Sequence, residues 1–313
     1  MSAVTPTPSE KSAFAVASRK SKRVHQWLAA NICFLCAIIG IATTIGIVII
    51  LVKESIPFFR DVPIWQFLTG TKWTPMFVNP QFGVLPLISG TVLITIGAAI
   101  IAIPLGVLTA VYLSEYAHPK VKQIVKPALE LLAGIPTVVY GYLGIFLVTP
   151  ILQRIFGVEN VSPYNAAAGA IVVGIMILPL VSSLCEDAIS SVPKALRDAA
   201  LGLGSTKVEA VWKIVLPSAL SGIMAAFILA ISRAVGETMA VTLAAGATPN
   251  LTLNPFASVQ TMTAYIVTVS KGDAAVGTTA YNTIYAVGIT LFAMTLVMNI
   301  LAIRLVKRFR QAY

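Results

Sequence analysis

Six apolar runs divide this chain, and each has about the 20 residues that an α-helix needs to cross a lipid bilayer. The sequence is 57% hydrophobic and only 11% charged, whereas soluble globular domains carry about 25% charged residues. The expected fold class is therefore an all-α integral membrane protein with six transmembrane helices. The predicted spans are residues 27–52, 84–113, 127–152, 165–184, 218–245 and 282–305.

The segments between the runs complete the predicted organisation. The first run is too long for a secretory signal peptide and lacks a cleavage site, so we expect it to remain as a span. Residues 84–306 are expected to form one core that contains the other five spans. The remaining predicted segments are a basic tail at 1–26, an ordered external loop at 53–83, a polar loop at 186–217, an external loop at 246–281 and a basic C-terminus at 307–313.

The basic residues lie mainly at the ends of the runs, and they predict an orientation. The net charge of +10 could suggest nucleic-acid binding, but this distribution is typical of membrane topology. Sixteen Lys and Arg residues fall on the side that holds both termini and the 186–217 loop, and five fall on the opposite side. Because positive charge is retained on the inner side, both termini and this loop are predicted to be cytoplasmic.

The charged stretch from Glu186 to Pro217 predicts two short helices joined by a glycine hinge. Pro193 suits a helix start, and Gly202 and Gly204 suit a helix end. Residues 206–209 have the spacing of a capping box for the second helix. That helix is expected to end or bend at Pro217. Its predicted apolar stripe, at intervals of three and four residues, consists of Val208, Val211, Trp212 and Val215.

This stretch resembles the EAA loop of ABC importer permeases, which receives the motion of a partner ATPase. The resemblance rests on the spacing of seven residues, and here an aspartate replaces the family's usual glutamate. The shorter carboxylate puts the detail of its partner contact in doubt. The resemblance implies that the coupling residues are Asp198, Ala199, Ala200, Gly204, Ile214, Leu216 and Pro217.

One pair of opposite charges lies inside a predicted span, in the sequence SRAVGETMAV. A charge in mid-membrane costs about 3 kcal/mol, so such residues are usually functional. Arg233 and Glu237 are four residues apart and are expected to share one helix face. We predict that both, with Thr238, line a translocation pathway, where the arginine fork suits an oxyanion. An ion pair that only packs two helices together is the alternative.

The same segment, with GIPTVVYGYLGIF in the third run, is similar to the C-type permeases of phosphate importers. Those proteins carry GETMA where the homologous A-type subunit usually carries GETAP. Gly134, Pro136, Gly141 and Gly144 also predict a kink in this run. The resemblance covers about residues 27–310. It implies a heterodimer with an A-type permease, two copies of a cytoplasmic ATPase and an external phosphate-binding protein in the inner membrane of a bacterium.

Other functions are weaker explanations of the sequence. It contains no G-x-x-x-x-G-K-[ST] run, so ATP and magnesium are expected at the partner ATPase, and no catalytic residue is expected here. Cys33 and Cys36 lie in an apolar run with no second ligand pair, so no metal site is predicted. A membrane enzyme would need more titratable residues than two histidines. Another oxyanion, an amino-acid cargo and a secondary transporter remain open.

Overall fold

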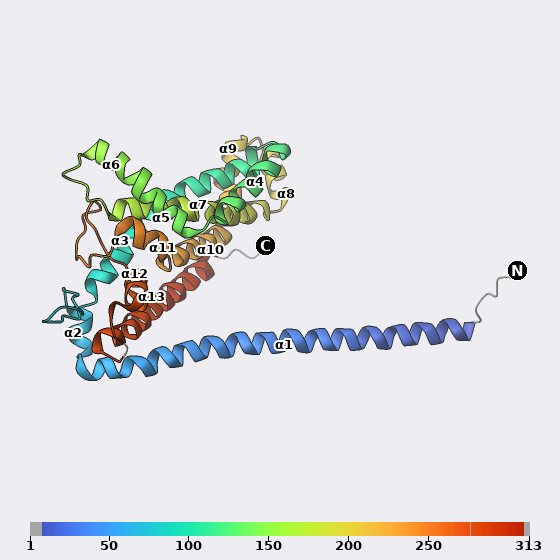
Figure 1. The fold of residues 1–313 in the computed structure, drawn as a ribbon. Coiled ribbons are helices and arrows are strands. Elements are labelled where there is room, and N and C mark those ends of the chain that lie inside the picture. Colours follow the sequence, from blue (N-terminus) through green and yellow to red (C-terminus); the bar gives the residue numbers. More distant parts are fainter. Residues whose placement is uncertain (1–7, 276, 310–313) are drawn as a thin grey trace, which may run out of the picture. The chain divides into compact units, whose positions relative to one another are not determined.

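The protein is built from helices (Figure 1). The structure, a computed structural model, describes residues 8–275 and 277–309, so residues 1–7 and 310–313 of the two predicted basic tails lie outside it. Within the described residues, six helices are long and apolar enough to cross a membrane, which confirms the predicted fold class. They are Gln26–Asp61, Leu85–Tyr116, Thr137–Phe156, Ala166–Ser190, Lys207–Val235 and Thr279–Arg304.

The chain forms two compact units, residues 1–53 and 54–313. The first unit consists of α1 (Pro8–Asp61) as far as Lys53. From Gln26 onward nearly all side chains of this unit are exposed, including large apolar ones such as Trp27 and Phe34. An apolar helix surface of this kind is suited to lipid rather than water.

The second unit begins with an aromatic cluster. It joins the last turns of α1, α2 (Ile64–Thr69) and an isolated antiparallel bridge between Trp73 and Phe82. Phe58 is fully buried and meets the rings of Phe67 and Phe82 edge to face, with centroids 5.6 and 5.4 Å away. Edge-to-face contacts are a favoured aromatic geometry. The segment predicted as an ordered loop at 53–83 therefore packs into a core that it shares with Met262, Tyr265 and Val287 later in the chain.

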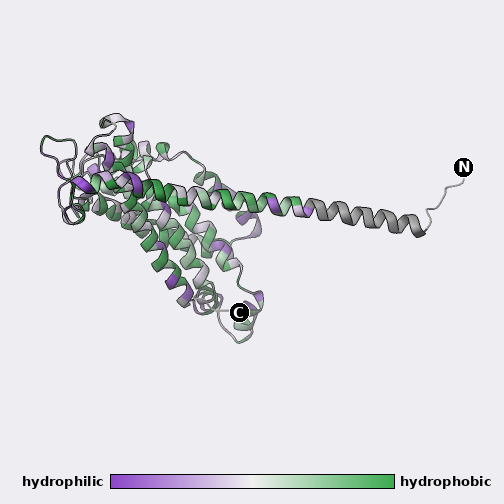
Figure 2. Ribbon diagram, turned by 90° about the horizontal axis from the view of Figure 1, so that it is seen from below, coloured by the Kyte–Doolittle hydropathy of each residue, from purple (hydrophilic) through white to green (hydrophobic). Residues whose placement is uncertain are grey.

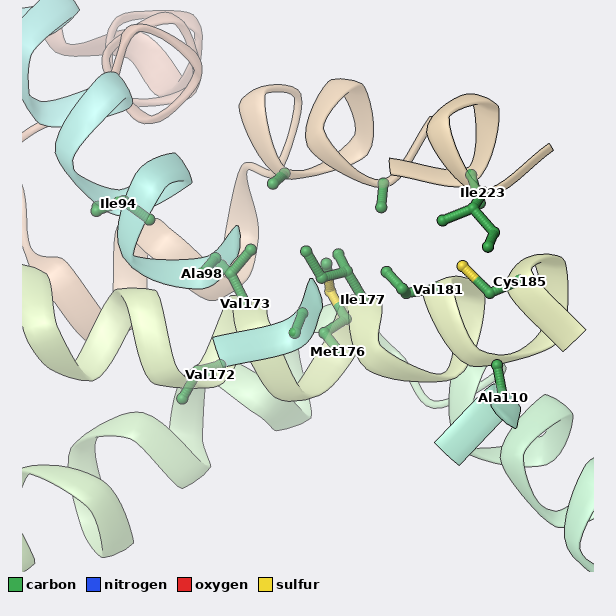
Figure 3. Close-up of a cluster of buried hydrophobic side chains, with 14 of the residues drawn as sticks. Ile94, Ala98, Ala110, Val172, Val173, Met176, Ile177, Val181, Cys185 and Ile223 are labelled. Carbon is green, nitrogen blue, oxygen red and sulfur yellow. The ribbon is translucent and has the colours of Figure 1, made fainter. Parts of the chain in front are cut away.

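The main core lies where α3 (Leu85–Val111), α7 (Ala166–Ser190) and α10 (Leu216–Val235) meet. Its side chains are small or β-branched and interdigitate closely (Figure 3). At Gly106 an added Cβ would lie only 2.6 Å from Cγ1 of Val181. Glycine is therefore required at this contact, which lets the backbones of α3 and α7 approach.

The predicted start of the third span (127–152) is wrong. Residues Pro119–Ala133 form a separate helix, α4, and the span begins after a break at Gly134–Pro136. Proline cannot continue a helix from the preceding turn, which explains the break and confirms the predicted kink. The span itself comprises α5 (Thr137–Leu143), the π-helical turn η2 (Gly144–Val148) and α6 (Thr149–Phe156).

The expected external loop at 246–281 is also partly helical. It follows α11 (Met239–Ala245), contains α12 (Met262–Thr268) and the π-helical turn η4 (Val269–Asp273), and leads into α13 (Thr279–Phe309). Residues 259–265 are buried, and the Met262 N–H donates to Oγ1 of Thr91 on α3 at 3.1 Å. The sequence suggested a loop because this segment is rich in threonine. In the structure, threonine hydroxyls make hydrogen bonds inside the fold.

Hydrophobic residues dominate the helices of the second unit, with hydrophilic residues mainly near helix ends (Figure 2). At one end of this unit lie α4, α8 (Lys194–Gly202) and α9 (Lys207–Ala210), while α2 and α6 lie toward the other (Figure 1). The polar end formed by α4, α8 and α9 contains the loop that the sequence singles out.

Replacing Gly106 with leucine should destabilise the fold, because the new side chain would overlap Val181 and overpacking costs about 1–3 kcal/mol. The thermal midpoint of the detergent-solubilised protein measures the effect. Gly40→Leu is the control, since no atom lies within 4 Å of a Cβ at Gly40. Equal midpoints for both variants would contradict the close α3–α7 contact.

Candidate functional site

The stretch 186–217 folds as two helices about a glycine hinge, as predicted. α8 ends at Gly202, and Gly204 follows with φ +89°, a conformation that favours glycine. Thr206 then caps α9: its Oγ1 accepts from the Glu209 N–H at 3.3 Å, and the Glu209 carboxylate accepts from the Thr206 N–H at 3.0 Å. Both halves of the predicted capping box are formed.

The second helix does not end at Pro217, one of the two outcomes that the sequence predicted there. α9 continues through the π-helical turn η3 (Val211–Val215) directly into α10. In this wider turn the Leu216 N–H donates to the Val211 carbonyl, five residues earlier. The turn shifts the hydrogen-bond register just before Pro217, which places the proline in the first turn of α10, where its missing N–H costs little. The loop and the fifth span are therefore one continuous helix from Lys207 to Val235.

The residues of the predicted coupling motif differ in exposure. Asp198, Ala199, Gly204 and Pro217 are exposed, Ile214 and Leu216 are half-buried, and Ala200 is buried. This division is suited to a motif whose buried members hold the two helices together. Its exposed members remain available to another molecule.

Large apolar side chains are exposed on the same two helices. Leu203 is 89% exposed and Trp212 is 58% exposed, and Leu201 and Val208 are exposed too. The predicted stripe is thus only half right, because Val211 and Val215 are buried while Val208 and Trp212 face outward. We call the exposed set Leu201, Leu203, Val208 and Trp212 the apolar loop surface. Exposed apolar groups of this size at a polar helix end mark interaction sites.

A buried carboxylate that the sequence analysis missed lies where this loop begins. Glu186 is 1% exposed and pairs with Lys122 and with Lys126, the latter at 2.7 Å. The Ser190 hydroxyl donates to it at 2.6 Å. A buried charge requires such partners. The available signal was the spacing of two lysines, four residues apart on one face of α4.

These ion pairs give α4 an inverted amphipathic arrangement. Lys122 and Lys126 are partly exposed and pair with Glu186 of α7, whereas Ile124 and Leu131 are exposed. Hydrogen bonds from Lys126 to Asp187 and to Glu186 raise the pKa of the Lys126 ammonium above its ordinary value, so the group remains charged. The face that contacts α7 therefore carries two charged groups, and exposed apolar side chains lie elsewhere on the helix.

A cavity of about 710 Å³ lies beside the other predicted site. Arg233 and Glu237 line it, with Met176 and Leu180 of α7 and Ala133 of α4. The structure therefore brings two of the three predicted pathway residues to one cavity, and Thr238 is not among the residues that line it. Arg233 lies 17 residues after Leu216 on the same helix, so about 25 Å of rigid helix connects the cavity to the loop.

Arg233 and Glu237 do not share a helix face, contrary to the expectation from their spacing. α10 ends at Val235, and the chain is non-helical from Gly236 to Thr238 before α11 begins. Arg233 is exposed, and the ion pairs among the described residues include none between it and Glu237. The glycine at 236 explains the difference, because it weakens the helix between the two charges.

Glu237 and Thr238 instead hold the break in place. Glu237 is 7% exposed, and its Oε1 accepts from the Ala240 N–H at 3.2 Å at the start of α11. The Thr263 hydroxyl donates to the Glu237 carbonyl at 2.7 Å. The Thr238 hydroxyl donates to the Gly236 carbonyl at 3.2 Å. The carboxylate accepts a hydrogen bond at the start of α11 while Glu237 and Arg233 both line the cavity.

The sequence is similar to curated transport proteins over most of its length. It is 34% identical over 288 residues to the probable ABC transporter permease protein YqgH of Bacillus subtilis (strain 168), covering 91% of this chain and 92% of that protein. It is also 34% identical over 255 residues to the phosphate transport system permease protein PstC of Mesorhizobium japonicum (strain LMG 29417), covering 76% and 77% of the two chains.

Solved structures share the fold. A chain of a bacterial alginate ABC transporter in complex with an alginate-bound periplasmic protein matches with a TM-score of 0.58 at 18% identity, covering 88% of this chain and 94% of that chain. A chain of the inward-facing MetNI methionine ABC transporter matches with a TM-score of 0.54 at 19% identity, covering 73% and 95%.

A family model described as "binding-protein-dependent transport system inner membrane component" matches residues 102–311. This range includes the coupling motif and the three pathway residues that the sequence analysis identified. The chain therefore belongs to this family and is a multi-pass membrane permease of an ABC importer.

Proposed function

We propose that this permease carries inorganic phosphate, with an A-type permease forming the other half of the pathway. The observation that carries the proposal is the exposed Arg233 on the wall of the cavity at the α10–α11 break. The similarity to a phosphate transport system permease protein supports the same cargo.

The geometry of Arg233 suits transient binding of an oxyanion. Its guanidinium can donate two parallel hydrogen bonds to a tetrahedral anion, which a lysine ammonium cannot. The Glu237 carboxylate lines the same cavity and caps α11. A fixed negative charge nearby weakens the hold of the arginine on an anion, and a transporter must release its cargo. Thr238, at the same break, completes the proposed pathway group.

The energy source in this proposal is a separate ATPase that docks on the apolar loop surface and on Asp198. Leu203 presents exposed apolar area at the end of α8, and Trp212 does so on the continuous helix that reaches Arg233. Two copies of the ATPase would use ATP and magnesium, and one copy would bind each permease. An external phosphate-binding protein would deliver the cargo.

Uptake into proteoliposomes tests the cargo directly. The complete complex should accumulate phosphate in an ATP-dependent way, and Arg233→Gln should lower the rate at least about tenfold, as expected for the loss of charge-assisted hydrogen bonds worth about 1.5–3 kcal/mol. The uptake rate of Arg233→Lys should lie between those of the unchanged protein and Arg233→Gln, because lysine retains the charge without the planar fork.

Arg304→Gln is the matched control, since it removes an exposed arginine from α13, away from the cavity. It should transport phosphate at the normal rate. Normal uptake by Arg233→Gln would remove this residue from the pathway. ATP-driven uptake of sulfate, molybdate or an amino acid in place of phosphate would overturn the proposed cargo and leave the ABC importer class intact.

Gly204→Val should reduce transport by altering the loop that the ATPase contacts. No atom lies within 4 Å of a Cβ at Gly204, so the cost is the backbone strain of a positive φ, about 1–2 kcal/mol, and not the steric clash that a crowded turn would give. Gly202→Val is the control, because Gly202 has the same open surroundings without a positive φ. Asp198→Lys should likewise weaken ATPase binding. Co-purification of the ATPase measures both effects, and full binding by Gly204→Val combined with Asp198→Lys would exclude the loop as its docking site.

The proposed orientation places both termini and the apolar loop surface in the cytoplasm. Single cysteines at Leu203 and at Ser270, both exposed, should therefore react with membrane-impermeant thiol reagents from opposite sides. Cys33 and Cys36 are exposed and must first be replaced. Labelling of Leu203→Cys in intact cells would contradict cytoplasmic docking.

A further inference from the structure

The π-helical turn η1 (Tyr112–Tyr116) ends α3 and contacts three separate segments through three successive side chains. The Ser114 hydroxyl lies 3.2 Å from the Ser190 hydroxyl at the end of α7. Glu115 pairs with Arg197 of α8 at 2.9 Å. The Tyr116 ring lies under the Lys207 ammonium of α9, 4.8 Å from its centroid. π-helical turns are frequent at functional sites, and this one touches both helices of the loop.

Among these contacts, Arg197 makes the most hydrogen bonds. Its Nε and Nη2 lie 3.1 and 2.9 Å from Oε1 of Glu115. Its Nη1 donates to the Val192 carbonyl at 2.6 Å, and its Nη2 donates to the Ile189 carbonyl at 2.7 Å. Carbonyls at a helix end lack partners within the helix, so the guanidinium satisfies the end of α7 and the Glu115 carboxylate together.

The burial of this ion pair separates it from an ordinary surface pair. The side chains of Arg197 and Glu115 are 19% and 9% exposed, whereas those of Lys213 and Glu209 are 73% and 46% exposed. Exposed pairs at this spacing contribute little. Among the described residues, the Arg197–Glu115 pair is also the one ion pair that joins α8 to a different helix.

The segments on either side of α8 give it little rigidity of their own. It is preceded by the turn at Ser191–Pro193 and followed by the positive-φ hinge at Gly204. α8 is also held by Leu196, which packs on the main core, and by the buried Ala200, and the guanidinium adds the ion pair to the end of α3. Arg197 therefore opposes independent movement of α8.

We propose that Arg197 is a positioning residue that makes α8, the end of α3 and the end of α7 move as one body when the ATPase displaces the loop. The α9–α10 helix packs directly against α3 and α7 in the main core, whereas Arg197 makes the ion pair that joins α8 to the end of α3. The proposal rests on the proposed docking of the ATPase at α8 and α9, and it assigns the transfer of motion to one side chain.

Spin labels measure the rigidity that the proposal requires. The labels are attached to cysteines at Lys194 on α8 and at Lys120 on α4, both exposed, and the native Cys33, Cys36 and Cys185 are replaced. The label on α4 reports on the end of α7, because Lys122 and Lys126 of α4 pair with Glu186. In the assembled complex we expect one narrow distance distribution, of equal width with ADP and with ATP. Arg197→Ala should broaden it and should lower the solute transported per ATP hydrolysed at least about fivefold, as expected for loss of charge-assisted hydrogen bonds.

Two conservative variants and one control complete the design. Arg197→Lys should recover part of the coupling ratio because it retains the charge opposite Glu115. Glu115→Gln should give a smaller loss because the bonds from Arg197 to the α7 carbonyls remain. Lys213→Ala, which removes an exposed ion pair from the same loop, should change neither readout.

The outcomes separate this proposal from the docking on which it rests. An unchanged distance distribution or an unchanged coupling ratio in Arg197→Ala would overturn it. If that variant does not assemble, wild-type values in Glu115→Gln would do the same. The label distance is also measured in the permease without its partners. Broadening by Arg197→Ala in this isolated permease would support the role of Arg197 in holding α8 even if the ATPase proves not to dock on the loop.

Discussion

A backbone N–H or C=O group inside a membrane has no water to bind, so each interruption of a helix there requires a partner from the protein. The break between α10 and α11 meets this requirement with side chains. Glu237 accepts from the Ala240 N–H, and Thr263 donates to the Glu237 carbonyl. The segment that supplies Thr263 is anchored in turn on α3 through Thr91. The buried segment after α11, the start of α12 and α3 thus support an opening that presents Arg233 to a cavity.

Much of this architecture could be predicted because length and hydropathy reflect the bilayer directly. The glycine hinge and capping box of the loop were also readable, since both depend on neighbouring residues. Which face of each helix is buried could not be predicted in the same way. In a membrane protein the apolar residues also cover the outside, so a stripe such as Val208–Val215 does not reveal which members face the core. α4 shows the extreme case, because Lys122 and Lys126 pair with the buried Glu186 while Ile124 is exposed.

Prolines were the other source of error, because their effect depends on the turn before them. Pro136 ends one helix and separates it from the next. Pro217 and Pro150 each follow a π-helical turn by two residues and lie in the first turn of an uninterrupted continuation. In both π-helical turns the N–H of the residue before the proline bonds five residues back. Whether a proline breaks a helix or is accommodated therefore depends on a local register that periodicity does not show.

The exposed apolar loop surface has a consequence for a copy of this chain that has not met its partners. Leu203 and Trp212 lie in a polar setting at a helix end, where they resemble the unfolded segments that chaperones and proteases recognise. A partner that covers these two side chains would hide them from chaperones and proteases. An orphan subunit would then be short-lived in the cell, and the amounts of the subunits would be balanced by degradation without any control of their synthesis.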